Sequence, residues 1–172
     1  MSTKSTIEEA ASKVTNVFSP NANPDSRDIL ATLRQEHEEV KSLLSDLQDA
    51  ESAEERTQLV KSIKAALIPH TKAEEEVVYD AVIGTAEEQA ETDGLEGYLE
   101  RELAAQTLER LEQADPTSPE HKATAKVLRE LVEHHIKEEE SSVWGDVKAH
   151  FDGDDRAAMN VAFATAKQSI KV

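Results

Sequence analysis

Two stretches of the sequence share one pattern, LIPHTKAEEEVVYD at residues 67–80 and LVEHHIKEEESSVWGD at residues 131–146. In each stretch a glutamate follows a histidine by four positions, and an aromatic residue follows the same histidine by nine. The residues concerned are His70, Glu74 and Tyr79 in the first stretch and His135, Glu139 and Trp144, each 65 positions later, in the second. This recurrence is too regular for coincidence and indicates a repeated unit.

The repeat extends to the segments that precede these stretches. EHEEVKSLLSDL at residues 36–47 aligns with ERELAAQTLERL at residues 100–111 when the sequence is shifted by 64 positions. The alignment pairs glutamates and leucines in both segments, but it places Arg101 opposite His37. The first two predicted helices are therefore expected to repeat as the third and fourth.

The composition predicts an all-α protein. Glycine and proline number five each in 172 residues, strong helix formers dominate, and alternating patterns typical of strands are missing. The predicted long helices cover residues 24 or 26 to 49, 52–83, 86 or 95 to 114, and 118–151. A further helix covers residues 154–170, and its apolar stripe consists of Met159, Ala162, Phe163, Ala166 and Ile170. Short connections between the long helices favour an up-down-up-down four-helix bundle with an additional C-terminal helix.

These elements define three expected regions. Residues 1–24 form a flexible N-terminal segment, with a possible short helix at 7–17, residues 25–151 form the bundle, and residues 152–172 form a C-terminal helix that packs on its outside. Pro69 lies within the second helix, where it removes a backbone hydrogen bond and is expected to bend the helix beside His70.

The spacing of histidine and glutamate is suited to metal binding. Residues four apart lie on one helix face, so two such helices can direct four ligands at one point: His70, Glu74, His135 and Glu139. His37 lies in an apolar stripe of the first helix and is expected to be a fifth ligand, since a buried imidazole needs a partner. Nitrogen and oxygen ligands without sulfur suit iron, manganese or zinc, and carboxylates can bridge two ions.

The same spacing also arises by chance in a sequence with 36 acidic residues, as His134 and Glu138 show. We expect His134 to lie beside the site at the surface, and His121 and His150 to be exposed. Tyr79 and Trp144 are expected to pack in the core without a chemical role. The glutamate runs at 74–76 and 138–140 are each expected to direct one carboxylate inward and to leave the others in solvent.

Charge and composition exclude several classes of partner. The net charge of −17 repels nucleic acid and anionic lipid, and the lack of cysteine removes disulfides and thiolate ligands. No signal peptide and no apolar run long enough for a membrane span is present in the sequence. We therefore expect a cytoplasmic protein that binds neither nucleic acid nor membranes; its oligomeric state stays open.

Together, these residues resemble the hemerythrin-like proteins of the HHE cation-binding family. The resemblance covers about residues 28–151 and includes the paired motifs HTKAEE and HIKEEE. It implies two non-haem irons bridged by Glu74 and Glu139, with His37, His70 and His135 as terminal ligands. The family has one more histidine on the third helix, where this sequence has Arg101, which cannot bind a metal and adds a positive charge.

This difference leaves several outcomes open. Either the second ion keeps an open position, or Glu102 or Tyr98 replaces the missing ligand, or only one ion binds. Alternatively, Arg101 forms a salt bridge with Glu74 or Glu139 in a site that has lost its metal.

The resemblance implies a non-haem iron protein that binds or turns over a small oxidant such as dioxygen, peroxide or nitric oxide, as in a response to oxidative stress. Two alternatives belong to other classes. One is a metal storage or delivery protein that holds several weakly bound ions. The other is a helical interaction or structural protein with a vestigial metal site.

Overall fold

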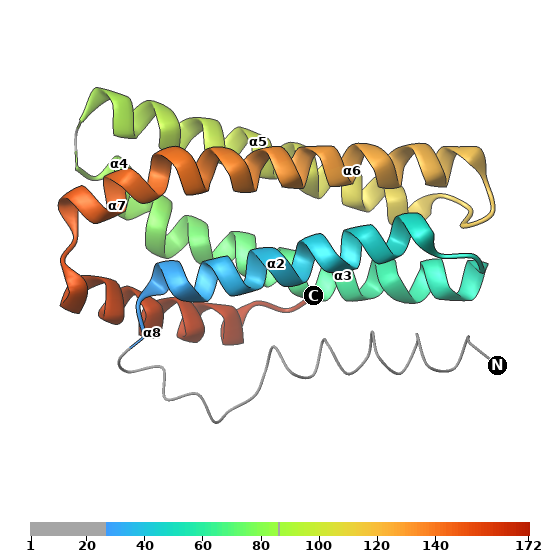
Figure 1. The fold of residues 1–172 in the computed structure, drawn as a ribbon, viewed down its shortest axis with the longest axis horizontal. Helices are drawn as coiled ribbons and strands as arrows, with labels where there is room; N and C mark the ends of the chain where they lie inside the picture. The colour runs from blue at the N-terminus through green and yellow to red at the C-terminus, as the bar shows by residue number, and fades with distance from the viewer. Residues whose placement is uncertain (1–26, 86) are drawn as a thin grey trace.

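The computed structural model describes residues 27–85 and 87–172 and shows a bundle of antiparallel helices (Figure 1). The elements are α2 (Ile29–Asp49), α3 (Ala53–Glu74), η2 (Glu75–Tyr79), α4 (Asp80–Ile83), α5 (Glu88–Gln113), α6 (Pro119–Glu138), η3 (Glu139–Val143), α7 (Trp144–His150) and α8 (Gly153–Ser169). Helix α3 continues through the π-helical turn η2 into α4, and α6 likewise continues through the π-helical turn η3 into α7. The predicted helix at residues 7–17 and the flexible segment 1–24 lie outside the described residues.

The four long helices pack in a ring. Helix α2 contacts α3 and α6, and α5 contacts α3 and α6, while α8 lies outside the ring against α2 and α3 (Figure 1). The predicted all-α bundle with an additional C-terminal helix is confirmed. Among the helices of the described residues, none has the length and apolar character that a membrane span requires.

The helix ends follow local capping chemistry, with one start predicted wrongly. Helix α2 begins at Ile29 rather than near residue 24 or 26, because the Asp28 side chain accepts a hydrogen bond from the Leu30 amide and caps the helix there. Ser52 and Ser118 cap α3 and α6 as expected.

Each half of the bundle contains a π-helical turn that the sequence analysis did not predict. Turn η2 begins directly after Glu74, and η3 begins at Glu139. A π turn inserts one extra residue into the helix and rotates the residues after it, and such turns are frequent at functional sites. Both turns occur at the glutamates of the repeated motif, so the duplication extends to the backbone conformation.

The apolar core has two clusters that lie one after the other along the bundle. One is formed mainly by leucines such as Leu44 and Leu108, and the other contains Tyr79, Trp144 and Phe163. Six buried polar residues lie at or beside the points where the sequence passes from one cluster to the other: His37, His70, Glu74, Arg101, His135 and Glu139. The two clusters thus enclose a polar layer.

Helix α8 and His121 depart in part from the sequence predictions. The α8 stripe buries Phe163 and Ala166, but Ala162 is exposed and Asn160 is buried instead. His121 is buried in the first turn of α6, whereas the sequence analysis expected it to be exposed. That expectation was wrong because the first turn of α6 faces the α2–α3 connection rather than solvent: His121 lines a hollow with Leu47 and residues of that connection.

Gly97 offers a direct test of packing beside the polar layer. A Cβ atom at Gly97 would overlap the Tyr79 ring, whereas one at Gly145 would meet nothing. We expect Gly97→Ala to lower the free energy of unfolding by about 1–2 kcal/mol, because overpacking outweighs the gain in helix propensity. Gly145→Ala, the matched control, should raise it by about 0.5–1 kcal/mol. Urea denaturation measures both; equal stabilisation by the two changes would contradict this packing.

Candidate metal centre

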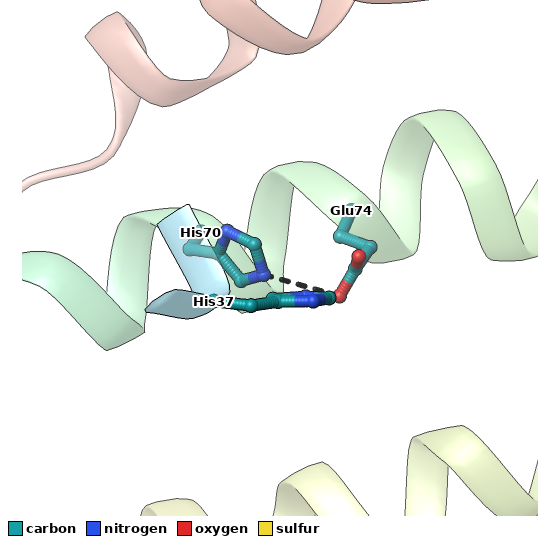
Figure 2. A group of neighbouring side chains, drawn as sticks. All are labelled: His37, His70 and Glu74. Carbon is teal, nitrogen blue, oxygen red and sulfur yellow. Dashed lines mark ion pairs between the residues drawn. The ribbon is translucent and has the colours of Figure 1, made fainter. Parts of the chain in front are cut away.

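The structure brings the five predicted ligands together in the interior of the bundle. They come from α2, α3, α6 and the start of η3, and all are buried: His37, His70, Glu74, His135 and Glu139. Two groups of three could each hold a metal ion, with ligand atoms within 4.8 Å of one another, and they share Glu74. The first group contains His37 and His70, and Figure 2 shows both rings beside the Glu74 carboxylate. The second contains His135 and Glu139.

Each of the three histidines pairs its Nδ1 atom with a glutamate outside the predicted set. The pairs are His37 with Glu140 at 3.0 Å, His70 with Glu36 at 2.9 Å, and His135 with Glu100 at 2.9 Å. A carboxylate accepts a hydrogen bond from Nδ1–H, which leaves the Nε2 lone pair free to bind a metal. This arrangement is typical of metal-binding histidines, whose orientation is fixed by a carboxylate behind the ring.

Within the described part of the chain, the inward atoms of the site lack hydrogen-bond partners. These atoms are Nε2 of His37 and His135, both carboxylate oxygens of Glu74, and Oε2 of Glu139. A buried polar atom without a partner costs about 1–3 kcal/mol, and more when it is charged. Metal cations at the two groups of ligands would satisfy these atoms, so the residues fit the iron that a hemerythrin-like site implies.

The two carboxylates are strongly perturbed. Burial and the neighbouring Glu139 raise the pKa of Glu74 well above its usual range, although Arg101 opposes the shift. Burial also acts to raise the pKa of Glu139, but the charges of His37 and His135 outweigh it and lower that pKa. Burial and mutual repulsion oppose the ionisation of both carboxylates, and a bound cation would stabilise both in their ionised form.

Arg101 lies inside the site. Its side chain is 2% exposed, its Nη1 atom is 3.7 Å from Oε2 of Glu74, and its Nε donates to the Gly97 carbonyl at 3.0 Å. Glu102 is exposed, and the Tyr98 hydroxyl is directed at a carboxylate of α4. Of the outcomes left open above, the structure therefore shows the salt bridge to Glu74 and places neither proposed replacement ligand in the site.

The guanidinium of Arg101 occupies the place that corresponds to the His37 ring in the other half of the bundle. In one half, Nε2 of His37 lies 3.8 Å from Glu139 and Nδ1 lies 3.0 Å from Glu140. In the other half, Nη1 of Arg101 lies 3.7 Å from Glu74 and Nε lies 3.6 Å from Glu75. Each pair runs from one nitrogen to the inner glutamate and from another to the glutamate that follows it. The alignment of Arg101 with His37 is thus reproduced in three dimensions.

The two aromatic residues of the repeat do more than pack. Trp144 donates its Nε1–H to Oε1 of Glu139 at 2.7 Å, and its ring stacks on His37. The Arg101 guanidinium carbon lies 3.8 Å from the Tyr79 ring centroid, and the Tyr79 ring stacks on His135. The expectation of core packing is confirmed, but both rings also contact the candidate ligands.

The sequence analysis missed the glutamates that orient the histidines. Glu36 and Glu100 occupy equivalent places in the repeat, and this recurrence was the available signal. Glu140 was expected to be solvated, which is wrong, because it reaches back to His37 across the helix interface. His134 is exposed as expected, and its Nε2 atom contacts Glu100 at 3.1 Å.

Comparison with known proteins identifies the family. Residues 28–144 match the hemerythrin HHE cation-binding domain. The chain therefore belongs to the hemerythrin HHE cation-binding domain family, as the repeated motifs predicted. This match covers the four-helix bundle through Trp144 and ends before α8.

A curated protein from Nostoc sp. (strain PCC 7120 / SAG 25.82 / UTEX 2576), named DNA nickase, is 25% identical to this chain over 158 residues. The alignment covers 92% of this chain but only 44% of that protein, so the chain spans less than half the length of its relative. No solved structure matches the chain.

Proposed function

We propose that this protein is a non-haem iron protein that binds one iron ion and uses it to bind or turn over a small oxidant. The observation that supports this most strongly is the set of buried, unpartnered nitrogen and oxygen atoms that converge between three carboxylate-oriented histidines. Dioxygen, peroxide and nitric oxide are the candidate ligands, because iron with an open position binds such molecules. Manganese or zinc would fit the same donor atoms.

The preference for one ion follows from the asymmetry of the two halves. His37 and His70 both face Glu74, with Glu139 3.8 Å from His37, so one end of the site has two imidazoles and two carboxylates. The other end has the same two carboxylates but only one imidazole, His135, together with the guanidinium of Arg101. A fixed positive charge close to Glu74 replaces the charge of a second ion and repels one.

The chain's own residues define what can happen at the ion. Its ligands are buried between two apolar clusters, so bulk water is kept from the ion, which strengthens electrostatic interactions there. The Arg101 atoms Nη1 and Nη2 have no hydrogen-bond partner among residues 27–85 and 87–172. They are available to donate to an anionic form of the small ligand.

Nitric oxide provides a test of this function. Protein loaded with Fe²⁺ without air and then exposed to nitric oxide should give the electron paramagnetic resonance signal of an isolated ferrous nitrosyl, because one iron with an open position is expected. His37→Ala, which removes a ligand, should abolish the signal. Iron-loaded protein that gives no such signal and does not react with dioxygen or peroxide would exclude small-oxidant chemistry.

One observation favours a second function, that of a structural or interaction protein with a vestigial site. The salt bridge between Arg101 and Glu74 compensates part of the buried negative charge without any metal. In that case chelation should leave the melting temperature unchanged, whereas a bound ion stabilises the folded state by mass action. Metal storage would instead give several weak, exchangeable ions in a calorimetric titration.

The name of the Nostoc relative does not change this proposal. That protein is more than twice as long as this chain, and the net charge of −17 opposes contact with a phosphate backbone. We propose a cytoplasmic protein whose partners are small molecules rather than DNA or membranes.

A further inference from the structure

We infer that α8 is part of the metal centre: Lys167 fixes the carboxylate that orients His70 and thereby favours the metal position at His37 and His70. This inference rests on the proposed metal binding and adds a residue that lies outside the family match, which ends at residue 144. Lys167 is a positioning residue in this scheme, because it acts on the ion only through Glu36 and His70.

A continuous chain of polar contacts runs from α8 to the site. The Lys167 ammonium lies 2.7 Å from Oε2 of Glu36, and the same oxygen accepts a hydrogen bond from Nδ1 of His70 at 2.9 Å. The side chains of Lys167 and Glu36 are 9% and 14% exposed, so solvent screens their interaction only weakly. Nε2 of His70 lies 3.6 Å from Glu74 on the opposite side of the ring.

The apolar part of α8 supports the same histidine. Phe163 is 1% exposed, and its ring meets the His70 ring edge to face with 5.8 Å between centroids. The Lys167 Nζ atom lies 5.3 Å from the Phe163 ring centroid. One turn of α8 therefore packs against His70 and also holds its carboxylate partner.

Among the residues that the structure describes, none gives the second half of the bundle such support. Glu100, which orients His135, contacts the exposed His134 rather than a lysine. Helix α8 covers α2 and α3, but not α5 or α6 (Figure 1). The two halves thus differ in two ways, and both favour the same metal position. Arg101 weakens the position at His135, and α8 strengthens the position at His37 and His70.

The physical effect of Lys167 is to hold the Glu36 carboxylate in place, because the Lys167 ammonium and Nδ1 of His70 both bind its oxygen Oε2. An ionised carboxylate can only accept, so His70 must donate from Nδ1 and offer Nε2 to the metal. Without Lys167, Glu36 is free to change rotamer, and the ring loses its fixed orientation.

The test compares Lys167→Met with Lys171→Met, an exposed lysine with the same change in charge. Competition with a chelator measures Fe²⁺ affinity, and we expect Lys167→Met to weaken it by about tenfold, the lower end of the range for residues that orient ligands. Lys171→Met should have no effect, and Lys167→Arg, which keeps the positive charge, should retain most of the parent's affinity for Fe²⁺. The melting temperature of each metal-free variant reports whether the fold is retained.

A double-mutant cycle with Glu36→Gln separates positioning from general stability. If Lys167 acts through Glu36, Lys167→Met should weaken metal binding no further in the Glu36→Gln background. An equal loss in both backgrounds, or wild-type affinity for Lys167→Met in protein that binds iron, would overturn the inference. A parent protein that binds no iron would instead contradict the proposed function itself.

Discussion

Arg101→His is expected to raise the iron content from about one to about two ions per chain, the largest gain of function that this structure predicts. The reason is the match between the two halves, in which Arg101 lies opposite Glu74 and Glu75 as His37 lies opposite Glu139 and Glu140. An imidazole at position 101 would face the inner carboxylate with a second glutamate behind it. It would add a ligand and remove a repelling charge together.

Two further variants isolate the cause. Arg101→Met removes the charge but adds no ligand, so its iron content should stay near one per chain. Glu102→Ala should change nothing, since that side chain is exposed. If Arg101→His binds no more iron than Arg101→Met, position 101 does not replace a metal ligand and the correspondence with His37 has no chemical meaning. Iron analysis of purified, iron-loaded protein measures all three.

His70→Ala and His135→Ala are expected to differ sharply. The proposed ion lies with His37, His70 and Glu74, so His70→Ala removes a ligand and should weaken iron binding more than the 10–100-fold typical of residues that merely orient ligands. His135→Ala removes an imidazole from the end that Arg101 occupies. It should keep one iron with little loss of affinity.

Chelator competition on the two variants, each with a melting curve for the metal-free protein, measures this difference. The duplicated sequence makes them matched controls, because each removes a buried imidazole from the same motif position. Equal losses of iron would show that one ion is shared by both histidines. A greater loss in His135→Ala would place the ion at the opposite end.

The helical repeat made the five candidate ligands accessible to sequence analysis. Residues four apart on a helix share a face, so the spacing of His70 and Glu74 determined their direction once the helix was recognised. The duplication then identified His135 and Glu139, and the apolar stripe of the first helix identified His37. Local periodicity was sufficient here, because each histidine–glutamate pair lies on one helix face.

The supporting contacts depend on packing between helices, which periodicity does not specify. Glu36 and Glu140 reach histidines on other helices, and Arg101 and Glu102 were equally compatible with the stripe of the third helix. The π turns add a further rotation after Glu74 and at Glu139 that an ideal helix would not predict. The sequence therefore indicated candidate ligands, but not which groups hold them in place.

The role of α8 illustrates the same limit. Its apolar stripe predicted that it packs on the bundle, but not on which helices. Lys167 follows Phe163 by one turn and is unremarkable in sequence, yet it meets Glu36, which lies 131 positions away. Only the three-dimensional structure relates α8 to His70.

The iron content of the unmodified protein tests the central claim most directly. Protein loaded with excess Fe²⁺ without air and then desalted should contain about one iron per chain, with a single anomalous scattering peak between His37, His70 and Glu74 in crystals. One ion is expected because Arg101 supplies the second positive charge. Two ions per chain would contradict this account of Arg101, and no bound iron would show that the site is vestigial.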